Sequence, residues 1–202
     1  MRRRVGAAAS GLLVVFGVVE VCRGLWIPAK AELAQVLVRR AWFAARAAGD
    51  DVRPWPWADT WPVARLRIPS LGIDEVVLDG ASGAVMAFAP GRLHGTAAPG
   101  GSGACVIAGH RDTHFAGLRS IELGCEVRLD DRSGRASRYV VREVAVIDED
   151  ELSRLECDGP SCLILLTCWP FDQLAGGGEL RFLVRAEREP EVTAPASSCA
   201  TS

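Results

Sequence analysis

Seven short apolar segments between residues 64 and 186 place the strongest constraint on the fold. Each is at most ten residues long, rich in Val, Ile and Leu, and bounded by Gly, Pro, Asp or Ser, which is the pattern of a β-strand followed by a turn. The segments read ARLRI, DEVVLD, ACVIA, EVRLD, RYVVREVAVI, CLILLT and LRFLVRA. Strands this short and this numerous predict a mainly β domain, either a closed barrel or a sandwich, rather than a βαβ fold.

The connections between these segments carry signals of their own. "DDRSGR" has the composition of a hairpin turn between EVRLD and RYVV. Residues 81–88 and 115–121 are predicted to form short helical turns. The predicted β domain spans residues 63–187, and residues 188–202 show no periodicity, so we expect a disordered tail there.

The N-terminal segment, residues 1–27, predicts a membrane anchor. Three arginines precede an apolar run from Val5 to Val21 that is broken only by Glu20, and the run is close to the shortest length that spans a bilayer. A cleaved signal peptide is the alternative, but no small-x-small cleavage site follows the run. Arginines at the N-terminus favour a cytoplasmic end, which would leave the rest of the chain outside the cytoplasm.

Residues 28–62 are expected to connect the anchor to the β domain. A helix is predicted from Pro28 to Gly49, either as a stalk or packed on the domain. One of its faces carries Leu33, Leu37, Ala41 and Ala44. The following "DDVRPWPWADTWP" contains prolines that interrupt regular structure, and its tryptophans fit either a membrane interface or a cover over the domain.

Composition excludes two classes of protein. With 49% apolar residues and a formal net charge of -2, the chain is neither disordered throughout nor a typical nucleic-acid binder, because no basic stripe stands out. At 202 residues it has room for one domain of ordinary size with appendages.

The seven cysteines are an odd number, so at least one cannot pair within the chain. They are scattered and none forms a CxxC motif, which argues against structural zinc. Cys157 and Cys162 flank a turn and could close a small loop in an oxidising compartment. The sequence leaves that disulfide open.

Cys168 has the placement of a functional residue because it follows the apolar run CLILL. Taken alone, it is as compatible with a buried small hydrophobe as with a nucleophile. A nucleophile needs the thiolate, which an imidazole and a guanidinium nearby would favour over the thiol, whose usual pKa is about 8.5. His110 follows the strand ACVIA, and Arg181 lies near the start of the last segment. Cysteine, histidine and arginine at three strand ends form an acyl-transfer site.

Other assignments of these residues remain open on spacing alone. His110 and His114 form an HxxxH pair that could bind a metal, although no third ligand has suggestive spacing. Each histidine, His94 included, could also be an ordinary surface residue. Arg185 is the alternative to Arg181, because residues four apart in a strand share a face.

The motifs "VIAGHRDTHF", "LLTCWPF" and "GGGELRFLVRA" together resemble those of the sortases, membrane-anchored cysteine transpeptidases. "HGTAAPG" makes the class D-like, proteobacterial branch the most similar, and the resemblance covers residues 64–186. It implies an eight-stranded β-barrel with Cys168 as nucleophile, His110 as acid and base, and Arg181 as the group that stabilises the oxyanion or positions the substrate. Thr167 matches the family's threonine and would assist at the oxyanion. No cofactor is implied.

The resemblance also implies a reaction. A sortase-like enzyme would cleave an LPxTG-like sorting signal of one dedicated exported protein through a thioester and transfer it to an amine, at the periplasmic side of a bacterial inner membrane. Two alternatives remain: a cysteine endopeptidase that lets water resolve the thioester, and a non-catalytic, membrane-tethered β-domain that binds exported proteins.

Overall fold

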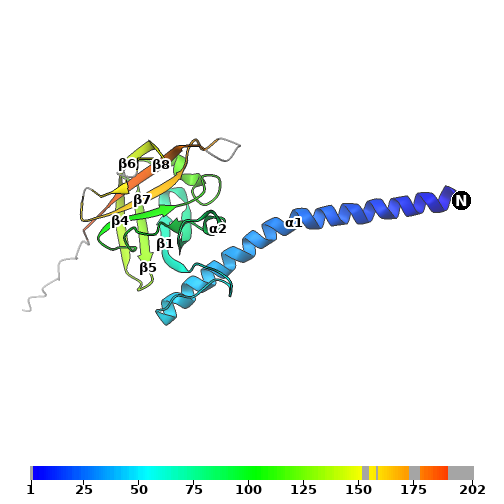
Figure 1. Ribbon diagram of the computed structural model, residues 1–202, viewed down its shortest axis with the longest axis horizontal. Helices are drawn as coiled ribbons and strands as arrows, with labels where there is room; N and C mark the ends of the chain where they lie inside the picture. Colours follow the sequence, from blue (N-terminus) through cyan, green and yellow to red (C-terminus); the bar gives the residue numbers. More distant parts are fainter. Residues whose placement is uncertain (1, 152–154, 158, 173–177, 191–202) are drawn as a thin grey trace, which may run out of the picture.

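The computed structural model describes residues 2–151, 155–157, 159–172 and 178–190, without the side chains of residues 2–15, 25 and 27–29. Eight strands close into a barrel in the order β1-β2-β3-β4-β7-β8-β6-β5 (Figure 1). Their bounds are β1 Pro62–Ile68, β2 Ile73–Asp79, β3 Gly91–Arg92, β4 Gly103–Ala108, β5 Glu126–Asp131, β6 Ala136–Asp148, β7 Ser161–Cys168 and β8 Leu180–Arg188. The barrel alternative is thus the correct one.

All seven strands predicted from apolar patterning are present, and β3 is the addition. It has two residues, too few to show a period, yet it closes the ring by pairing with β2 in parallel and with β4 antiparallel. β4 and β7 are also parallel, from Gly103 opposite Ser161 to Ala108 opposite Leu166. This pairing brings two chain segments far apart in sequence side by side.

The predicted turns are also confirmed. A short helix α2, Gly83–Met86, begins after Ser82, whose hydroxyl accepts a hydrogen bond from the amide of Val85. Two 3-10 helices, η1 Pro69–Leu71 and η2 Ala116–Ser120, cover other connections. Between β5 and β6 the hairpin turn uses Gly134 at φ +90°, a conformation that glycine adopts without strain.

The barrel interior is an apolar core built from alternate residues of the strands. Its fully buried members include Leu66, Ile107, Leu129, Leu163 and Val184. Because successive side chains of a strand point to opposite faces, the residues between them point out of the barrel. This alternation decides which face each candidate site residue occupies.

The N-terminal helix is a single element, α1, Arg2–Ala48, and no new helix begins at Pro28. An interior proline removes one helical hydrogen bond and usually kinks or breaks a helix, but α1 runs through Pro28 as one element. Gly49 ends the helix at φ +76°, as predicted. In the part of the chain whose side chains are described, no helix is long and apolar enough to cross a membrane. Most of the predicted anchor lies outside that part.

The C-terminal half of α1 packs on the barrel. Val38 and Trp42 are buried against Val76 and Leu78 of β2 and against Ala89 in the connection from α2 to β3. The contacting face is not the one that carries Leu33, Leu37, Ala41 and Ala44: of that set only Ala41 is buried, while Leu33 is exposed. Because α1 contacts β1 and β2, which lie across the ring from β7 and β8, the outer face of β7 and β8 stays uncovered by it (Figure 1).

The tryptophan-rich connection covers the domain. The Trp55 ring meets Phe88 edge to face with centroids 4.9 Å apart, and Trp61 packs against the interior core. Trp57 alone of the three is largely exposed. The predicted tail falls mainly on residues 191–202, which lie outside the described residues.

Candidate active site

The two last strands bring Cys168 and Arg181 face to face. They are direct partners in the antiparallel pairing of β7 and β8, so their side chains lie on the same side of the sheet. Their neighbours Thr167 and Phe182 are buried on the interior side. Cys168, at the end of β7, and Arg181, near the start of β8, therefore both point out of the barrel, and Cys168 is a half-buried residue rather than a member of the buried core.

His110 reaches the same level through the parallel partner of β7. The register puts Ala108 opposite Leu166, so His110, two residues beyond β4, follows that strand at the same end of the sheet as Cys168, two residues beyond Leu166. Gly109 holds that register beyond the strand, because its amide donates to the Leu166 carbonyl at 3.1 Å. The structure thus gathers the three predicted residues at one end of the adjacent strands β4, β7 and β8.

Thr167 secures this arrangement from the interior side. Its hydroxyl is buried and donates a hydrogen bond of 2.7 Å to the Gly109 carbonyl. Together with the Gly109 amide bond, it fixes the backbone immediately before His110. The side chains of Thr167 and Cys168 point to opposite faces of β7. The hydrogen bond of Thr167 is therefore made to the backbone before His110 and not on the face that carries Cys168.

The turn after His110 depends on a glycine. A Cβ at position 109 would lie 2.9 Å from the Phe115 ring, closer than such atoms approach, so only glycine lets that ring pack here. The Phe115 amide also donates to the His110 carbonyl at 3.0 Å. The "GHRDTHF" sequence therefore folds into a tight turn that begins at the end of β4 and contains His110.

The Arg181 guanidinium has a fixed set of acceptors. One terminal nitrogen donates to the Glu149 carboxylate at 2.7 Å, and the other donates to the carbonyls of Gly178 and Leu180. Glu149 follows β6, and its amide donates to the Glu179 carbonyl at 2.7 Å. Sequence reasoning missed Glu149, because nothing in "DEDEL" marks one carboxylate among its acidic neighbours.

Aromatic rings support the chain after Cys168. Trp169 stacks on Phe182 with centroids 5.7 Å apart, and Phe171 meets Phe182 edge to face at 5.1 Å. The Trp169 amide donates to the Leu180 carbonyl at 3.1 Å. These contacts extend the β7–β8 pairing past the cysteine and hold its backbone.

The other cysteines differ from Cys168 in environment. Cys105 is buried inside the barrel, and this burial raises the pKa of its thiol to about 11, so almost none of it is ionised at neutral pH. Cys157 and Cys162 form a disulfide with Cα atoms 5.7 Å apart. The disulfide left open by the sequence is therefore present.

The remaining histidines and the alternative arginine have other partners. His114 Nδ1 lies 3.3 Å from a Glu75 carboxylate oxygen, and His94 Nε2 lies 3.1 Å from Asp79. Among the described residues, no three His, Cys, Asp or Glu side chains gather as a metal site would need. Arg185 is buried and pairs with Glu143 at 3.3 Å.

A half-buried thiol, an imidazole and a guanidinium on one rim have the parts of a covalent acyl-transfer centre. The thiol can supply a nucleophile, the imidazole can carry a proton, and the guanidinium can stabilise a developing oxyanion. A closed mixed β-barrel with a cysteine, a histidine and an arginine at one end fits the class of thiol-dependent acyltransferases and peptidases.

Comparison with known proteins identifies the family. The model of the sortase domain matches residues 66–189, more than half of the chain. The chain belongs to the sortase family, whose members are cysteine transpeptidases.

Individual relatives agree with this assignment. Sortase D of Bacillus subtilis is 27% identical over 124 residues, which cover 61% of this chain and 62% of the relative, so the match leaves over a third of that protein uncovered. Sortase C-1 of Actinomyces oris is 28% identical with a TM-score of 0.57, covering 64% of this chain and 73% of that one. A Clostridium perfringens sortase D5 transpeptidase shares the fold, with 20% identity, a TM-score of 0.59 and coverage of 72% and 86%.

Proposed function

We propose that the protein is a cysteine transpeptidase that cleaves an LPxTG-like sorting signal of a dedicated exported protein and transfers the acyl part to an amine. The observation that carries this proposal is the direct pairing of Cys168 with Arg181 on the outer face, with His110 at the end of the neighbouring strand. Membership of the sortase family supports it.

The first half-reaction forms the acyl-enzyme. The Cys168 thiolate attacks the carbonyl carbon of the scissile bond, and the Arg181 guanidinium stabilises the negative oxygen of the tetrahedral intermediate. The C–N bond then breaks as the His110 imidazolium gives its proton to the leaving amine. The products are a thioester on Cys168 and a free amine.

The second half-reaction reverses these roles. An incoming amine attacks the thioester carbon while His110 accepts a proton from it. The C–S bond breaks, the new amide leaves, and the thiolate is restored. Thr167 holds the backbone before His110 through its hydrogen bond to Gly109. We further propose that Thr167 assists in stabilising the oxyanion.

We also place the domain at the periplasmic side of a bacterial inner membrane, anchored through residues 1–27. The Cys157–Cys162 disulfide supports an oxidising compartment, because cytosolic proteins rarely keep such bonds. An anchor beside exported substrates would raise their effective concentration at the site. Cell fractionation with protease access to the barrel tests this placement, and a cytosolic fraction resistant to external protease would contradict it.

The deciding experiment compares the wild type with Cys168→Ala on a panel of LPxTG-like peptides with and without an added amine. Ligated product and a trapped thioester, both absent in Cys168→Ala, are the expected results. Cys105→Ala is the matched control and should keep activity, because that thiol lies inside the barrel. Cleavage without ligation would indicate an endopeptidase, and binding without cleavage would indicate the non-catalytic domain.

A further inference from the structure

The face of α1 that points away from the barrel carries an exposed apolar stripe. Trp26, Leu33, Val36 and Phe43 are 61%, 58%, 53% and 59% exposed. Single exposed apolar residues are common on protein surfaces, but several gathered in one line mark a surface that another molecule covers. In Figure 1 the N-terminal part of α1 projects away from the barrel, so the domain does not cover this part of the stripe.

The stripe follows a heptad spacing. Its members, together with the exposed Val19 and Cys22, recur at intervals of three, four or seven residues. They occupy positions a and d of a seven-residue repeat over more than three heptads, which is the pattern of a helix that pairs with another helix. Arg40 is the one charged member of the repeat. We call this set the heptad seam: Val19, Cys22, Trp26, Leu33, Val36, Arg40 and Phe43.

The heptad seam and the barrel contact lie on opposite faces of α1. Val38 and Trp42 are the residues buried against the barrel. At about 100° per residue, Val36 in the seam and Val38 in the contact point about 160° apart. Two copies of the chain can therefore pair along the seam with their barrels on the outside.

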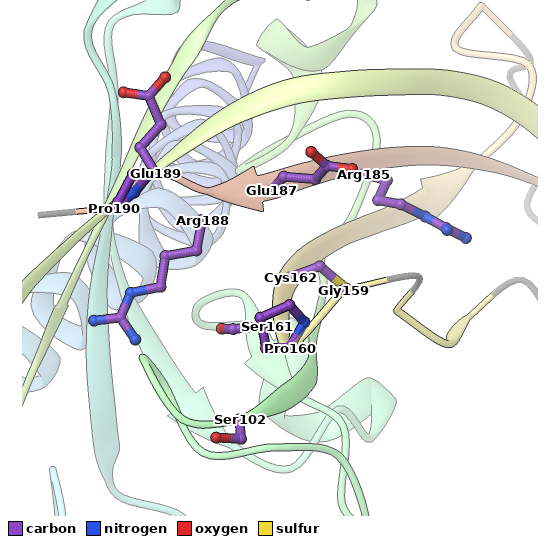
Figure 2. Close-up of a pocket in the computed structure, with 10 residues that line it drawn as sticks. All are labelled: Ser102, Gly159, Pro160, Ser161, Cys162, Arg185, Glu187, Arg188, Glu189 and Pro190. Atoms are coloured by element: carbon purple, nitrogen blue, oxygen red, sulfur yellow. The ribbon is translucent and has the colours of Figure 1, made fainter.

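Such a pair leaves the working parts of each barrel open. α1 contacts β1 and β2, and β7 and β8 lie across the ring from them. The rim with Cys168 is on β7 and β8, and so is an open pocket of about 690 Å³ whose lining includes Cys162 and Arg188 (Figure 2). A second copy bound along the heptad seam covers neither of them.

The exposed area of the heptad seam is sufficient for a stable pair. An aromatic side chain can bury about 150–250 Å², so the exposed parts of Trp26 and Phe43 together offer about 250 Å². Val19, Leu33 and Val36, each about half exposed, add a similar area. The sum is about 500 Å² per helix, and a specific interface needs about 1,000 Å² from both partners together. A second copy of this chain supplies the matching seam.

We propose that the protein forms a parallel homodimer through the heptad seam of α1. The parallel direction rests on the anchor proposed above, because two copies that enter one membrane through residues 1–27 have helices that run the same way. The pairing itself does not depend on the chemistry at Cys168. Arg40 faces its counterpart at an a position, where one polar residue fixes the register and the number of chains at a cost in stability.

The position of Cys22 makes the arrangement measurable. In a parallel pair, Cys22 lies beside the partner's Cys22. In an antiparallel pair over the same seam it lies opposite Phe43, about 32 Å from the other Cys22 at about 1.5 Å per residue. Cys22 is exposed and unbonded, so a short bis-maleimide can join the two thiols only in the parallel pair.

The test uses the full chain, in detergent micelles and in membranes of cells that express it. Analytical ultracentrifugation of the micelles should give the mass of two copies, and the bis-maleimide should cross-link them in both settings. Cys22→Ser should abolish the cross-link and keep the two-copy mass.

Substitutions in the heptad seam give the second measurement. Leu33→Glu should raise the dissociation constant about tenfold or more, because it buries a charge in the seam. Ala31→Glu, at an exposed position outside the seam, is the matched control and should leave it unchanged. Arg40→Leu should lower the dissociation constant because the facing charges are removed. Near-UV circular dichroism of each variant should match the wild type, which shows that the barrel is folded.

The contrary outcomes are distinct. A single-copy mass without a cross-link in either setting overturns the dimer. A dimer that Leu33→Glu does not weaken overturns the heptad seam as its interface, and a two-copy mass without the Cys22 cross-link overturns the parallel arrangement. A single-copy chain whose binding to phospholipid vesicles falls with Leu33→Glu assigns the stripe to a lipid surface and likewise overturns the proposal. Each of these results leaves the transpeptidase proposal standing.

Discussion

Replacing Thr167 by valine tests how the barrel positions the histidine. The threonine hydroxyl donates to the Gly109 carbonyl at 2.7 Å, and Thr167 is only 3% exposed. Valine keeps the branched shape but has no donor, so the Gly109 carbonyl loses this partner in a buried site. Nothing at the surface of the active site changes directly.

The cost follows from that contact. Leaving a buried acceptor without its donor destabilises a protein by about 1–3 kcal/mol. Thr167→Ser keeps the hydroxyl and loses one methyl group, which costs about 1 kcal/mol. The two variants can therefore have similar stability, and turnover must discriminate between them.

Turnover should separate the variants sharply. Without the bond from Thr167, Gly109 still donates its amide to the Leu166 carbonyl, but the ladder of β4 with β7 ends one residue earlier, at Ala108. A displacement of the imidazole by about 1 Å can lower the rate about 100-fold. We expect Thr167→Val to lower kcat by about tenfold to 100-fold with a small change in KM, while Thr167→Ser stays within about threefold of the wild type.

Urea unfolding followed by tryptophan fluorescence and peptide turnover measured on the same preparations check both parts. A valine variant with wild-type stability and wild-type turnover would refute the reasoning. A valine variant that loses turnover but unfolds with the wild-type free energy would show that the lost turnover does not come from loss of the buried hydrogen bond.

Three further predictions concern the surroundings of the site. Glu149→Gln should lower kcat/KM about tenfold or less, because Arg181 loses its carboxylate partner. Its unfolding free energy should stay within about 0.5 kcal/mol of the wild type because the carboxylate is exposed. Glu126→Gln is the control, and equal kinetics for the two variants would contradict the prediction. Replacing Cys157 and Cys162 by serine should lower the unfolding free energy in urea by about 2 kcal/mol and raise KM more than it lowers kcat. An unchanged KM would show that the connection from β6 to β7 has no role in substrate binding. The thiol of Cys105 has a pKa near 9 in the unfolded chain and about 11 in the folded one, so its contribution to stability is complete below pH 9 and is lost as the pH rises toward 11. Cys105→Ala should therefore weaken the fall in unfolding free energy between these two pH values. An equally steep fall in both proteins would contradict this reasoning.

Much of the fold was readable because strand signals are local. ACVIA, CLILLT and LRFLVRA each show the length and residue types of a strand, and each appears as one. The two-residue strand β3 has no such signal. The sequence did not indicate which face of α1 packs, because Leu33 and Ala34 are both apolar and only the barrel surface selects between adjacent faces.

The candidate site was partly readable for the same reason. A cysteine, a histidine and an arginine at strand ends are visible in the chain, and the motif resemblance ordered them into roles. Glu149 was not visible, because an acidic side chain has no local mark that tells an ion-pair partner from a solvated charge.

The sequence by itself determined the strands, the turns that join them and the residue types available at their ends, since these depend on neighbours a few positions apart. Only the tertiary structure decided that β4 lies parallel to β7 and that β8 pairs with it, which brings residues 110, 168 and 181 to one rim. That decision depends on how the whole barrel closes its hydrogen bonds and buries its core, which no short stretch of sequence encodes.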